Sequence, residues 1–306
     1  MDTVLYYCDE YLFDGLYAKL FPSYTRHVAG KLISSWPRDD VWRASLSLFL
    51  ITSFFGWILY FVTATLSYYF VFDHSYKNHP KFLKNQVRME IECATNAIPW
   101  MTLLTLPWFL GEVFGKSMLY GGMPKSLSEW AYIVISVPVF LFFTDCGIYW
   151  FHRWMHHPSV YKYLHKLHHK WIIPTPFASH AFNPFDGYIQ SLPYHMYAFL
   201  IPMHKFQYLF MFCFVNFWTV MIHDGEFISH SEIINTSAHH FVHHVYFNYN
   251  YGQYFTFWDR VGGSHRQPTD EQYDKALRDD HKVMARQAHD ADTIENATLS
   301  DKLKTL

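Results

Sequence analysis

Histidine is the residue of this 306-residue chain whose number and spacing point to chemistry. Of its 21 histidines, 15 lie between positions 152 and 244. Many of these stand in three clusters: His152, His156 and His157; His165, His168 and His169; and His240, His243 and His244. Neutral imidazole is the commonest protein ligand for transition metals. The clusters therefore predict a metal site built from distant parts of the chain.

The spacing within each cluster is helical. Residues at i, i+3 and i+4 share one face of an α-helix, so each cluster can aim its imidazoles at one centre. The three clusters without His157 supply eight imidazoles, which exceeds the three or four protein ligands of a mononuclear zinc site and predicts two metal ions. Imidazole suits iron, copper, nickel and zinc alike, so the residues alone leave the metal's identity open.

Two alternative readings apply to histidine-rich sequences. A metal-buffering tract would place its histidines in low-complexity runs, whereas here they are regularly spaced among Trp, Tyr and Leu residues. A non-catalytic metal-binding membrane protein such as a transporter would carry ionisable residues within its spans, and the apolar blocks of this chain have few. A built catalytic site is therefore the preferred interpretation.

Long apolar segments must position these histidines. Residues 41–72 contain a single charge, Arg43, and exceed the roughly 20 residues that cross a bilayer, so they form one long span or a tight hairpin. Residues 94–114 and 130–150 are further candidate spans with aromatic residues at their ends. Residues 187–222 are broken around Pro202 and favour a shallow helical hairpin. We expect an all-α integral membrane protein with four or five membrane-embedded helices and a histidine-rich helical cap that holds a dinuclear metal site.

Charge predicts the sidedness and the domain organisation. Basic residues gather in 73–93 and 152–170, which places both segments, the histidine clusters and the C-terminus on the cytosolic side. The expected organisation is an N-terminal segment (1–40), a membrane-embedded catalytic domain (41–269) and a charged cytosolic tail (270–306). A formal net charge of −2 gives no electrostatic footprint for nucleic acid, so none is expected as a partner.

Beyond the histidine clusters, several longer strings resemble a known family. The pattern HxxxHH, HxxHH and HxxHH after hydrophobic spans is similar to the fatty acid hydroxylase superfamily, over roughly residues 41–263. Four strings resemble its sterol C-5 desaturases (lathosterol oxidases) in particular: ATLSYYFVFDH at 64–74, HPKFLKNQVRMEI at 79–91, PTPFASHAF at 174–182 and YNYGQYFTFWDRVGGS at 249–264.

This resemblance implies an activity, its cofactors and its partners. The enzyme would use two iron ions and dioxygen to introduce the C-5(6) double bond into a Δ7-sterol, a reaction of the lathosterol to 7-dehydrocholesterol type in sterol biosynthesis. Electrons would come from cytochrome b5 and NADH-cytochrome b5 reductase. The site would lie in the membrane of the endoplasmic reticulum, in contact with membrane lipid, and Lys302 and Lys304 resemble a dilysine retrieval signal of that membrane. A C-4 methylsterol oxidase or a lipid hydroxylase of the same superfamily is the alternative.

The resemblance also implies further site residues. His223 corresponds to a ninth ligand, and no catalytic residue is expected apart from the metal ligands. The hydroxylases have another ligand where this chain has Thr219, and His180 is the first candidate to replace it, followed by His157 and His239. Asn183 stands where relatives have histidine. Substrate contacts are expected within 171–199. Four acids could accept the second ring N–H of ligating histidines: Asp145, Asp186, Asp224 and Asp259.

Overall fold

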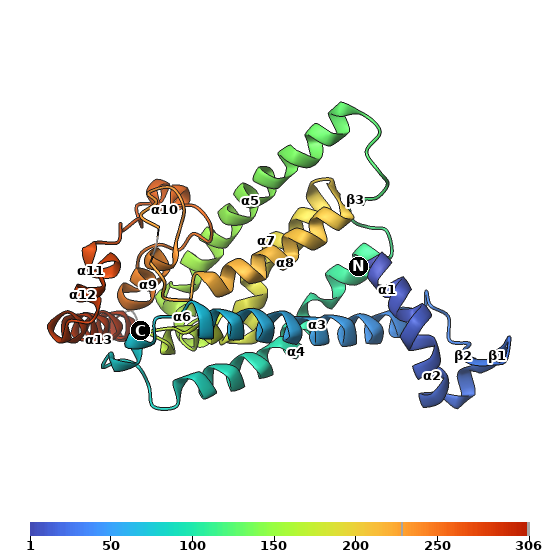
Figure 1. The fold of residues 1–306 in the computed structure, drawn as a ribbon, viewed down its shortest axis with the longest axis horizontal. Helices are drawn as coiled ribbons and strands as arrows, with labels where there is room; N and C mark the ends of the chain where they lie inside the picture. Colours follow the sequence, from blue (N-terminus) through green and yellow to red (C-terminus); the bar gives the residue numbers. More distant parts are fainter. Residues whose placement is uncertain (228, 305–306) are drawn as a thin grey trace.

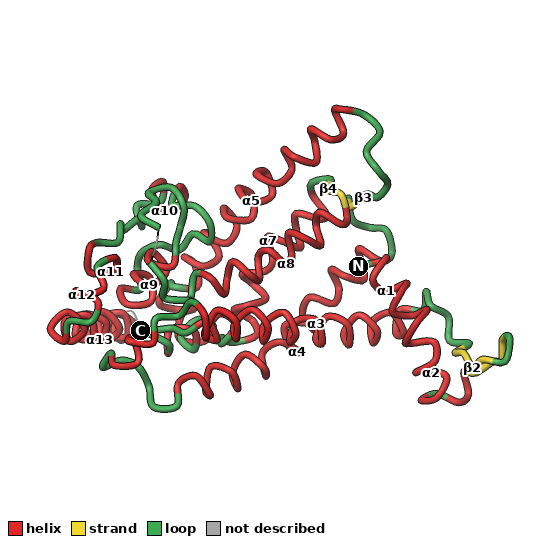
Figure 2. Tube along the Cα trace, in the orientation of Figure 1, coloured by secondary structure: helices red, strands yellow, loops and turns green. Residues whose placement is uncertain are grey.

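The computed structural model describes residues 1–227 and 229–304, which are mostly helical (Figures 1 and 2). Three long helices, α3 (Val41–Phe70), α4 (Gln86–Val113) and α5 (Leu127–Met155), and the shorter pair α7 (Pro184–Leu200) and α8 (Lys205–Met221) form the body. The remaining elements lie at its two ends. They are α1 (Asp2–Cys8), η1 (Asp9–Phe13), α2 (Asp14–Leu20), η2 (Pro22–Tyr24), β1 (Thr25–Val28), β2 (Lys31–Ser34), η3 (His74–Asn78), β3 (Leu119–Tyr120), α6 (Pro158–Leu164), η4 (His168–Lys170), η5 (Pro176–His180), β4 (Met203–His204), α9 (Ser237–Tyr246), α10 (Phe257–Val261), α11 (Asp270–Tyr273), α12 (Lys275–Arg278) and α13 (His281–Lys304).

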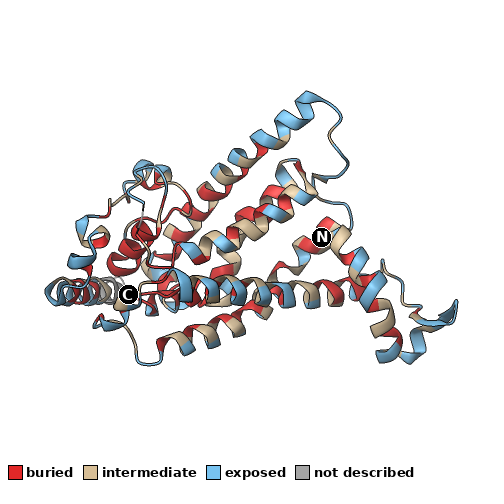
Figure 3. Cartoon of the chain, viewed as in Figure 1, coloured by how far each residue is buried: buried red, intermediate tan, exposed pale blue. Residues whose placement is uncertain are grey.

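Helices α3 and α5 are long and apolar enough to cross a bilayer. Helix α3 is one uninterrupted helix, which decides between the two expected forms of 41–72, and it begins where the Asp40 side chain accepts hydrogen bonds from two backbone N–H groups. Both helices carry large apolar side chains that are exposed, such as Phe54 on α3 and Val134 on α5. Figure 3 shows the exposed faces of these helices. Of the described helices, only these two meet the length and hydropathy of a span, so the expected count of four or five embedded helices stays a prediction.

The apolar block 187–222 forms the expected helical hairpin. Helix α7 ends at Leu200 and α8 begins at Lys205, with the break around Pro202. The connection is fixed by a short parallel pairing of β4 with β3, the segment that precedes α5. The hairpin packs against α4 and α5 through α7 and against α3 through α8. The five helices therefore enclose a common interior.

The short elements α6, η4, η5 and α9 gather at one end of the long helices, where buried residues are concentrated (Figure 3). Helix α13 packs across α9 and α6 at this end, and it buries Met284, Ala288 and Ala291. The described part of this C-terminal segment therefore packs onto the helical body. These three buried positions are spaced i, i+4 and i+7 and so form a stripe along one face of the helix. Because two of the three are alanine, the stripe is hard to recognise in the sequence. The lysines at 302 and 304 have side chains outside the described part of the structure.

The first forty residues cap the opposite end of α3. Arg43, which is 1% exposed, donates to Asp9 (2.7 Å) and to Asp14 (2.6 Å). These ion pairs join the N-terminal helices to the first turn of α3. The hairpin of β1 and β2 extends beyond them, far along the molecule from α13 (Figure 1).

Candidate metal centre

Five histidines, which lie in α5, η4 and α9 or directly after α5 and α6, form a first group of imidazoles. Their ligand atoms all lie within 4.8 Å of one another. His152 Nε2 is 3.0 Å from His165 Nε2, and His156 Nε2 is 3.1 Å from His169 Nε2. We call this set group 1, which consists of His152, His156, His165, His169 and His243.

Four more histidines form a second group beside the first. His240 Nε2 lies 3.0 Å from His223 Nε2 and 3.1 Å from His244 Nε2. The ring centres of His169 in group 1 and His244 are 5.1 Å apart, so the two groups adjoin. We call this set group 2, which consists of His168, His223, His240 and His244. The nine histidines expected as ligands are thus brought together as two neighbouring sets; their role as ligands stays a prediction.

The local structure agrees with the expected helical spacing in α9 but not in the second cluster. His240, His243 and His244 lie on α9. His240 and His244 belong to group 2, and His243 belongs to group 1. The expected α-helix over 165–169 is wrong, because α6 ends at Leu164 and η4 is a 3₁₀ turn. The tighter turn directs the neighbours His168 and His169 into different groups.

Hydrogen bonds to the second ring nitrogens fix how four of the imidazoles present their Nε2 atoms. Each Nδ1–H donates to an oxygen, so each Nε2 carries a lone pair. The pairs are His152 with the Tyr251 carbonyl (3.0 Å), His165 with Asp186 (2.7 Å), His223 with the Thr219 carbonyl (2.7 Å) and His243 with the Tyr249 carbonyl (2.7 Å).

This arrangement fits bound cations. The Nε2 atoms of His152 and His165 are 3.0 Å apart, and in the neutral tautomers that donate from Nδ1 neither Nε2 carries a hydrogen. The buried Nε2 of His243 has no hydrogen-bond partner among the described residues. Two nitrogens that bind one ion at right angles at about 2.1 Å would be about 3 Å apart. A positive ion between the rings would turn this repulsion into attraction, so the residues present fit a pair of metal ions.

Of the four candidate acids, only Asp186 contacts a ring. Asp145 instead accepts from the backbone N–H groups of Gln253 (2.8 Å) and Tyr254 (2.7 Å). Asp259 accepts from Tyr251 (2.8 Å) and Gly252 (2.9 Å), and Asp224 accepts from Glu226 (2.9 Å). Asp145 and Asp259 therefore hold the loop that supplies the Tyr251 carbonyl to His152. These two acids therefore contact the backbone that supports a ring instead of contacting the ring itself, as had been expected.

The three substitute ligands stay outside both groups. His180 Nε2 donates to Asn216 Oδ1 and its Nδ1 accepts from Ser179, both at 3.1 Å. His157 is exposed and caps α6, and His239 uses Nδ1 in a capping box with Thr236 at the start of α9. The Asn183 side chain caps α7. Helix capping therefore occupies His157, His239 and Asn183, and hydrogen bonds to neighbouring side chains occupy His180.

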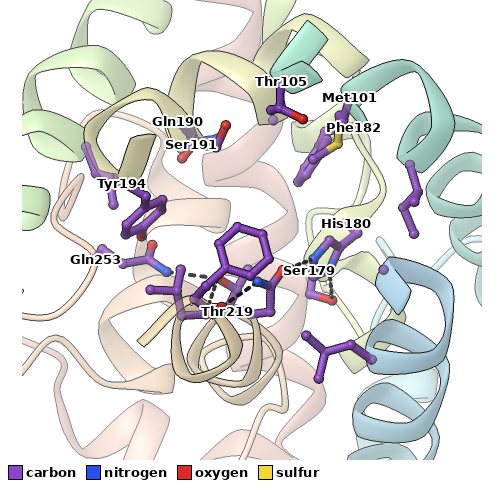
Figure 4. Close-up of a pocket in the computed structure, with 18 of the residues that line it drawn as sticks. Met101, Thr105, Ser179, His180, Phe182, Gln190, Ser191, Tyr194, Thr219 and Gln253 are labelled. Atoms are coloured by element: carbon purple, nitrogen blue, oxygen red, sulfur yellow. Dashed lines mark hydrogen bonds between the residues drawn. The ribbon is translucent and has the colours of Figure 1, made fainter. Parts of the chain in front are cut away.

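A cavity opens onto both groups from the interior of the helix bundle (Figure 4). Its empty volume is about 1280 Å³ with its open mouth included. Its walls are mostly apolar, and its histidine floor is formed by His152 of group 1 with His168, His223 and His240 of group 2. From the expected stretch 171–199 it takes Ser179, His180, Phe182, Gly187, Gln190, Ser191, Tyr194 and His195.

Lining residues from α3, α4 and α8 were missed by the sequence analysis. On α8 they include Phe212, Val215, Asn216 and Thr219, which are spaced i, i+3, i+4 and i+7 and so share one face. Two polar residues on one face of an otherwise apolar helix were a usable signal. The contributions of α3 and α4 depend on tertiary packing and carry no such signal.

Acidification is expected to unfold the metal-free protein. Burial first, and neighbouring imidazoles second, hold the pKa of six histidines well below the ordinary 6.5: His156, His168, His169, His240, His243 and His244. Burial lowers the pKa of His223 to about 4. The unfolded chain binds these protons near pH 6.5 and the folded chain does not, so stability is full above pH 6.5 and is lost as the pH falls toward 4. Each of these imidazoles lowers the free energy of unfolding by up to about 1.4 kcal/mol per pH unit in this range.

Urea unfolding of metal-stripped protein in detergent at pH 7.5, 6.0 and 5.0 measures this loss. Metal-loaded protein is the control, because bound metal keeps the imidazoles neutral in the fold and adds its own binding free energy. A midpoint that does not change between pH 7.5 and 5.0 in the stripped protein would contradict the prediction.

Comparisons with known proteins identify relatives over nearly the whole chain. Residues 137–264 match the family model described as fatty acid hydroxylase. A Delta(7)-sterol 5(6)-desaturase of Eremothecium gossypii is 46% identical over 96% of this chain and 96% of its own length. The protein of that name in Schizosaccharomyces pombe is 49% identical over 98% of this chain and 95% of its own. That of Saccharomyces cerevisiae is 54% identical over 79% of this chain and 67% of its own.

No solved structure matches this chain. The family model nevertheless covers both ends of the histidine constellation, from His152 to His244, and the relatives extend the likeness to α3 and α4 on one side and α13 on the other. The chain belongs to the fatty acid hydroxylase family and, within it, to the Delta(7)-sterol 5(6)-desaturases.

Proposed function

We propose that this enzyme introduces the C-5(6) double bond into a Δ7-sterol, with dioxygen as co-substrate and two iron ions held by the nine histidines of groups 1 and 2. The relatives' names support the substrate class. The observation that carries the proposal is the cavity, because its apolar walls end on imidazoles of both groups. A rigid, flat and mostly apolar sterol nucleus suits such walls.

Group 1 would hold one ion and group 2 the other. The iron pair supplies the oxidising power that breaking an unactivated C–H bond requires, since no side chain has it. The protein's part is to hold nine neutral ligands with no carboxylate in either group, which leaves the charge of the ions uncompensated. The buried apolar wall around Phe182 and Ile148 keeps water from the reacting carbons.

The electron balance requires an external donor. Reducing dioxygen to two waters takes four electrons; the sterol supplies two as it loses two hydrogens, and the other two must come from outside. We propose cytochrome b5, reduced by NADH-cytochrome b5 reductase, as that donor. It would approach the end of the molecule that carries α6, α9 and α13, because the histidine groups lie at this end.

The proposed location is the endoplasmic reticulum membrane, with the histidine groups and the C-terminus cytosolic. Helices α4, α7 and α8 would lie in the membrane with α3 and α5, because they pack together around the cavity. The proposed domains are the N-terminal segment 1–40, the membrane-embedded catalytic domain 41–269 and the cytosolic part 270–306. The segment 1–40 lies at the far end of α3 and would face the lumen (Figure 1).

Glycosylation should distinguish the two ends of the molecule. Asn235 and Asn296 stand in acceptor patterns, and both should remain unmodified because their end is cytosolic. Asn296 is the better reporter, since it is exposed whereas Asn235 is buried. Ser23→Asn creates an acceptor with Thr25 on the exposed N-terminal segment and should be modified. Endoglycosidase treatment followed by gel mobility measures both; modification at Asn296 would reverse the proposed orientation.

Expression in a yeast strain that lacks sterol C-5 desaturase tests the function. The accumulated Δ7-sterol should fall and the Δ5,7-diene should appear in the sterol profile. Unchanged sterols despite stable, membrane-bound protein would contradict the proposal. Removal of 4-methylsterols in a second strain that lacks its own C-4 methylsterol oxidase, without diene formation in the first strain, would indicate a C-4 methylsterol oxidase, the alternative within the superfamily.

A further inference from the structure

Polar side chains that are linked by hydrogen bonds form an arc along one wall of the mostly apolar cavity (Figure 4). Asn216 and Thr219 stand on the same face of α8, three residues apart. Asn216 Oδ1 accepts from His180 Nε2 at 3.1 Å, and Thr219 Oγ1 accepts from Gln253 Nε2 at 3.0 Å. We call these four residues the polar arc. It joins three segments of the chain, namely η5, α8 and the loop after α9.

The arc has hydrogen-bonding capacity that the described residues do not use. Asn216 Nδ2 donates one hydrogen to the Phe212 carbonyl (2.7 Å), which leaves its second hydrogen. Gln253 Nε2 uses one hydrogen on Thr219, and no described donor reaches Gln253 Oε1. Buried polar groups are normally paired. When an apolar ligand fills the cavity, this spare donor and this spare acceptor require a polar group on the ligand itself.

The arc lies beside the histidine floor of the cavity. The Thr219 carbonyl accepts from His223 Nδ1 at 2.7 Å. His223 follows the end of α8, and Thr219 and Asn216 precede it by four and seven residues, which corresponds to about 6 and 11 Å of helical rise. The only polar group of the sterol substrate is the 3β-hydroxyl, on the ring that contains C-5. When C-5 and C-6 reach the histidine floor, the hydroxyl must lie within a few ångströms of it, where the arc stands.

We propose that Asn216 and Gln253 bind the 3β-hydroxyl of the sterol: it accepts from Asn216 Nδ2 and donates to Gln253 Oε1. His180 and Thr219 are positioning residues that hold the two amides. This inference rests on the proposed function and adds an orientation to it. The ring system enters hydroxyl first, and the alkyl tail extends toward the edge of the cavity at Phe55, whose side chain is 43% exposed on α3.

The same arc accounts for a departure from the hydroxylase pattern. Position 219 carries a hydroxyl where the hydroxylases have a ligand, and group 2 forms without it. Its threonine holds Gln253 by a side-chain hydrogen bond and His223 by its carbonyl. One residue therefore links the proposed hydroxyl site to the metal centre.

Binding without turnover tests the proposal. Metal-loaded enzyme in detergent, kept without electron donor, is titrated with a Δ7-sterol and with its 3-deoxy analogue, and displacement of a fluorescent sterol gives both affinities. Wild-type protein should prefer the hydroxyl sterol about tenfold, the value of about 1.4 kcal/mol expected of a good hydrogen bond. Asn216→Leu and Gln253→Leu, which keep the approximate size of each side chain, should reduce the ratio to nearly one. Their affinity for the 3-deoxy analogue should be retained, and this retained affinity reports that they fold.

Thr105→Val is the matched control, because it removes a hydroxyl from the opposite side of the same cavity (Figure 4). Its preference ratio should equal that of the wild type. The hydroxyl site is refuted by a wild-type protein that binds both sterols equally, by leucine variants that keep the ratio, or by Thr105→Val losing it. A wild-type protein that binds neither sterol refutes the proposed function instead. If a leucine variant binds neither sterol, Gln253→Asn is tested in its place. This substitution keeps an amide but moves it away from the ligand, and it should lower the preference ratio.

Discussion

Replacing His240 with Ala is expected to abolish desaturation, lowering diene formation by more than 100-fold. The His240 Nε2 lies within 3.1 Å of both His223 and His244, so it is central to group 2. Its loss would remove a ligand of one ion, which costs at least the 10- to 100-fold that removal of a ligand's supporting partner costs. His243→Ala should do the same from group 1. The measurements are iron per chain in purified protein and diene formation by the same preparation.

Two other histidines supply the controls for these variants. His204 lies at the tip of the α7–α8 hairpin, where its Nε2 donates to the Gly122 carbonyl, and His204→Ala should keep both iron and activity. His180→Ala should keep its iron, because His180 stands outside both groups. Wild-type iron content and turnover in His240→Ala or His243→Ala would disprove the dinuclear assignment.

Asp186→Asn should weaken iron binding about 10- to 100-fold. Asp186 is fully buried and accepts from His165 Nδ1 at 2.7 Å and from Gln190 Nε2 at 2.7 Å. Its carboxylate accepts the Nδ1 hydrogen of His165 and so fixes the ring that faces His152. The neutral amide keeps the shape and removes the charge. Competition with an iron chelator of known affinity measures the effect, and activity at saturating iron separates weak binding from slow chemistry.

Asp224→Asn is the matched control for this prediction. Asp224 is also buried near group 2, but it accepts from the backbone of Glu226 and contacts no imidazole. Its replacement should leave the iron affinity within about twofold of the wild type, since no ring orientation depends on it. Equal losses in the two variants would show that general destabilisation, rather than the His165 contact, is responsible.

Much of the candidate site could be predicted because its histidines form local patterns. The i, i+3, i+4 spacing of His240, His243 and His244 is a direct property of helix α9. Which group each residue joins could not be predicted, because it depends on the 3₁₀ turn that separates His168 from His169. Hydrogen bonds that compete for a side chain were also invisible, as for His180, whose two nitrogens are both engaged.

The fold was predictable where apolar length and helix breakers decide it. The unbroken α3 and the hairpin break around Pro202 follow from composition and from proline. The docking of α13 was not predictable, because its buried stripe consists largely of alanine in a charged segment. The cavity was only half predictable. Its α7 wall lies in a recognisable stretch, whereas its α3 and α4 walls exist only because helices distant in sequence pack together.

The packing of α13 over α9 and α6 bears on the order in which the parts of the site are synthesised. During synthesis the ribosome makes His152 to His169 first, His240 to His244 much later, and α13 last of all. Helix α9 carries histidines of both groups, and α13 covers it and also reaches α6 through the ion pair of Lys166 with Glu295 (3.0 Å). The nine histidines of groups 1 and 2, which all precede residue 245, are therefore made before the helix that covers them, and the two groups gain this cover only when the last described helix of the chain has been synthesised.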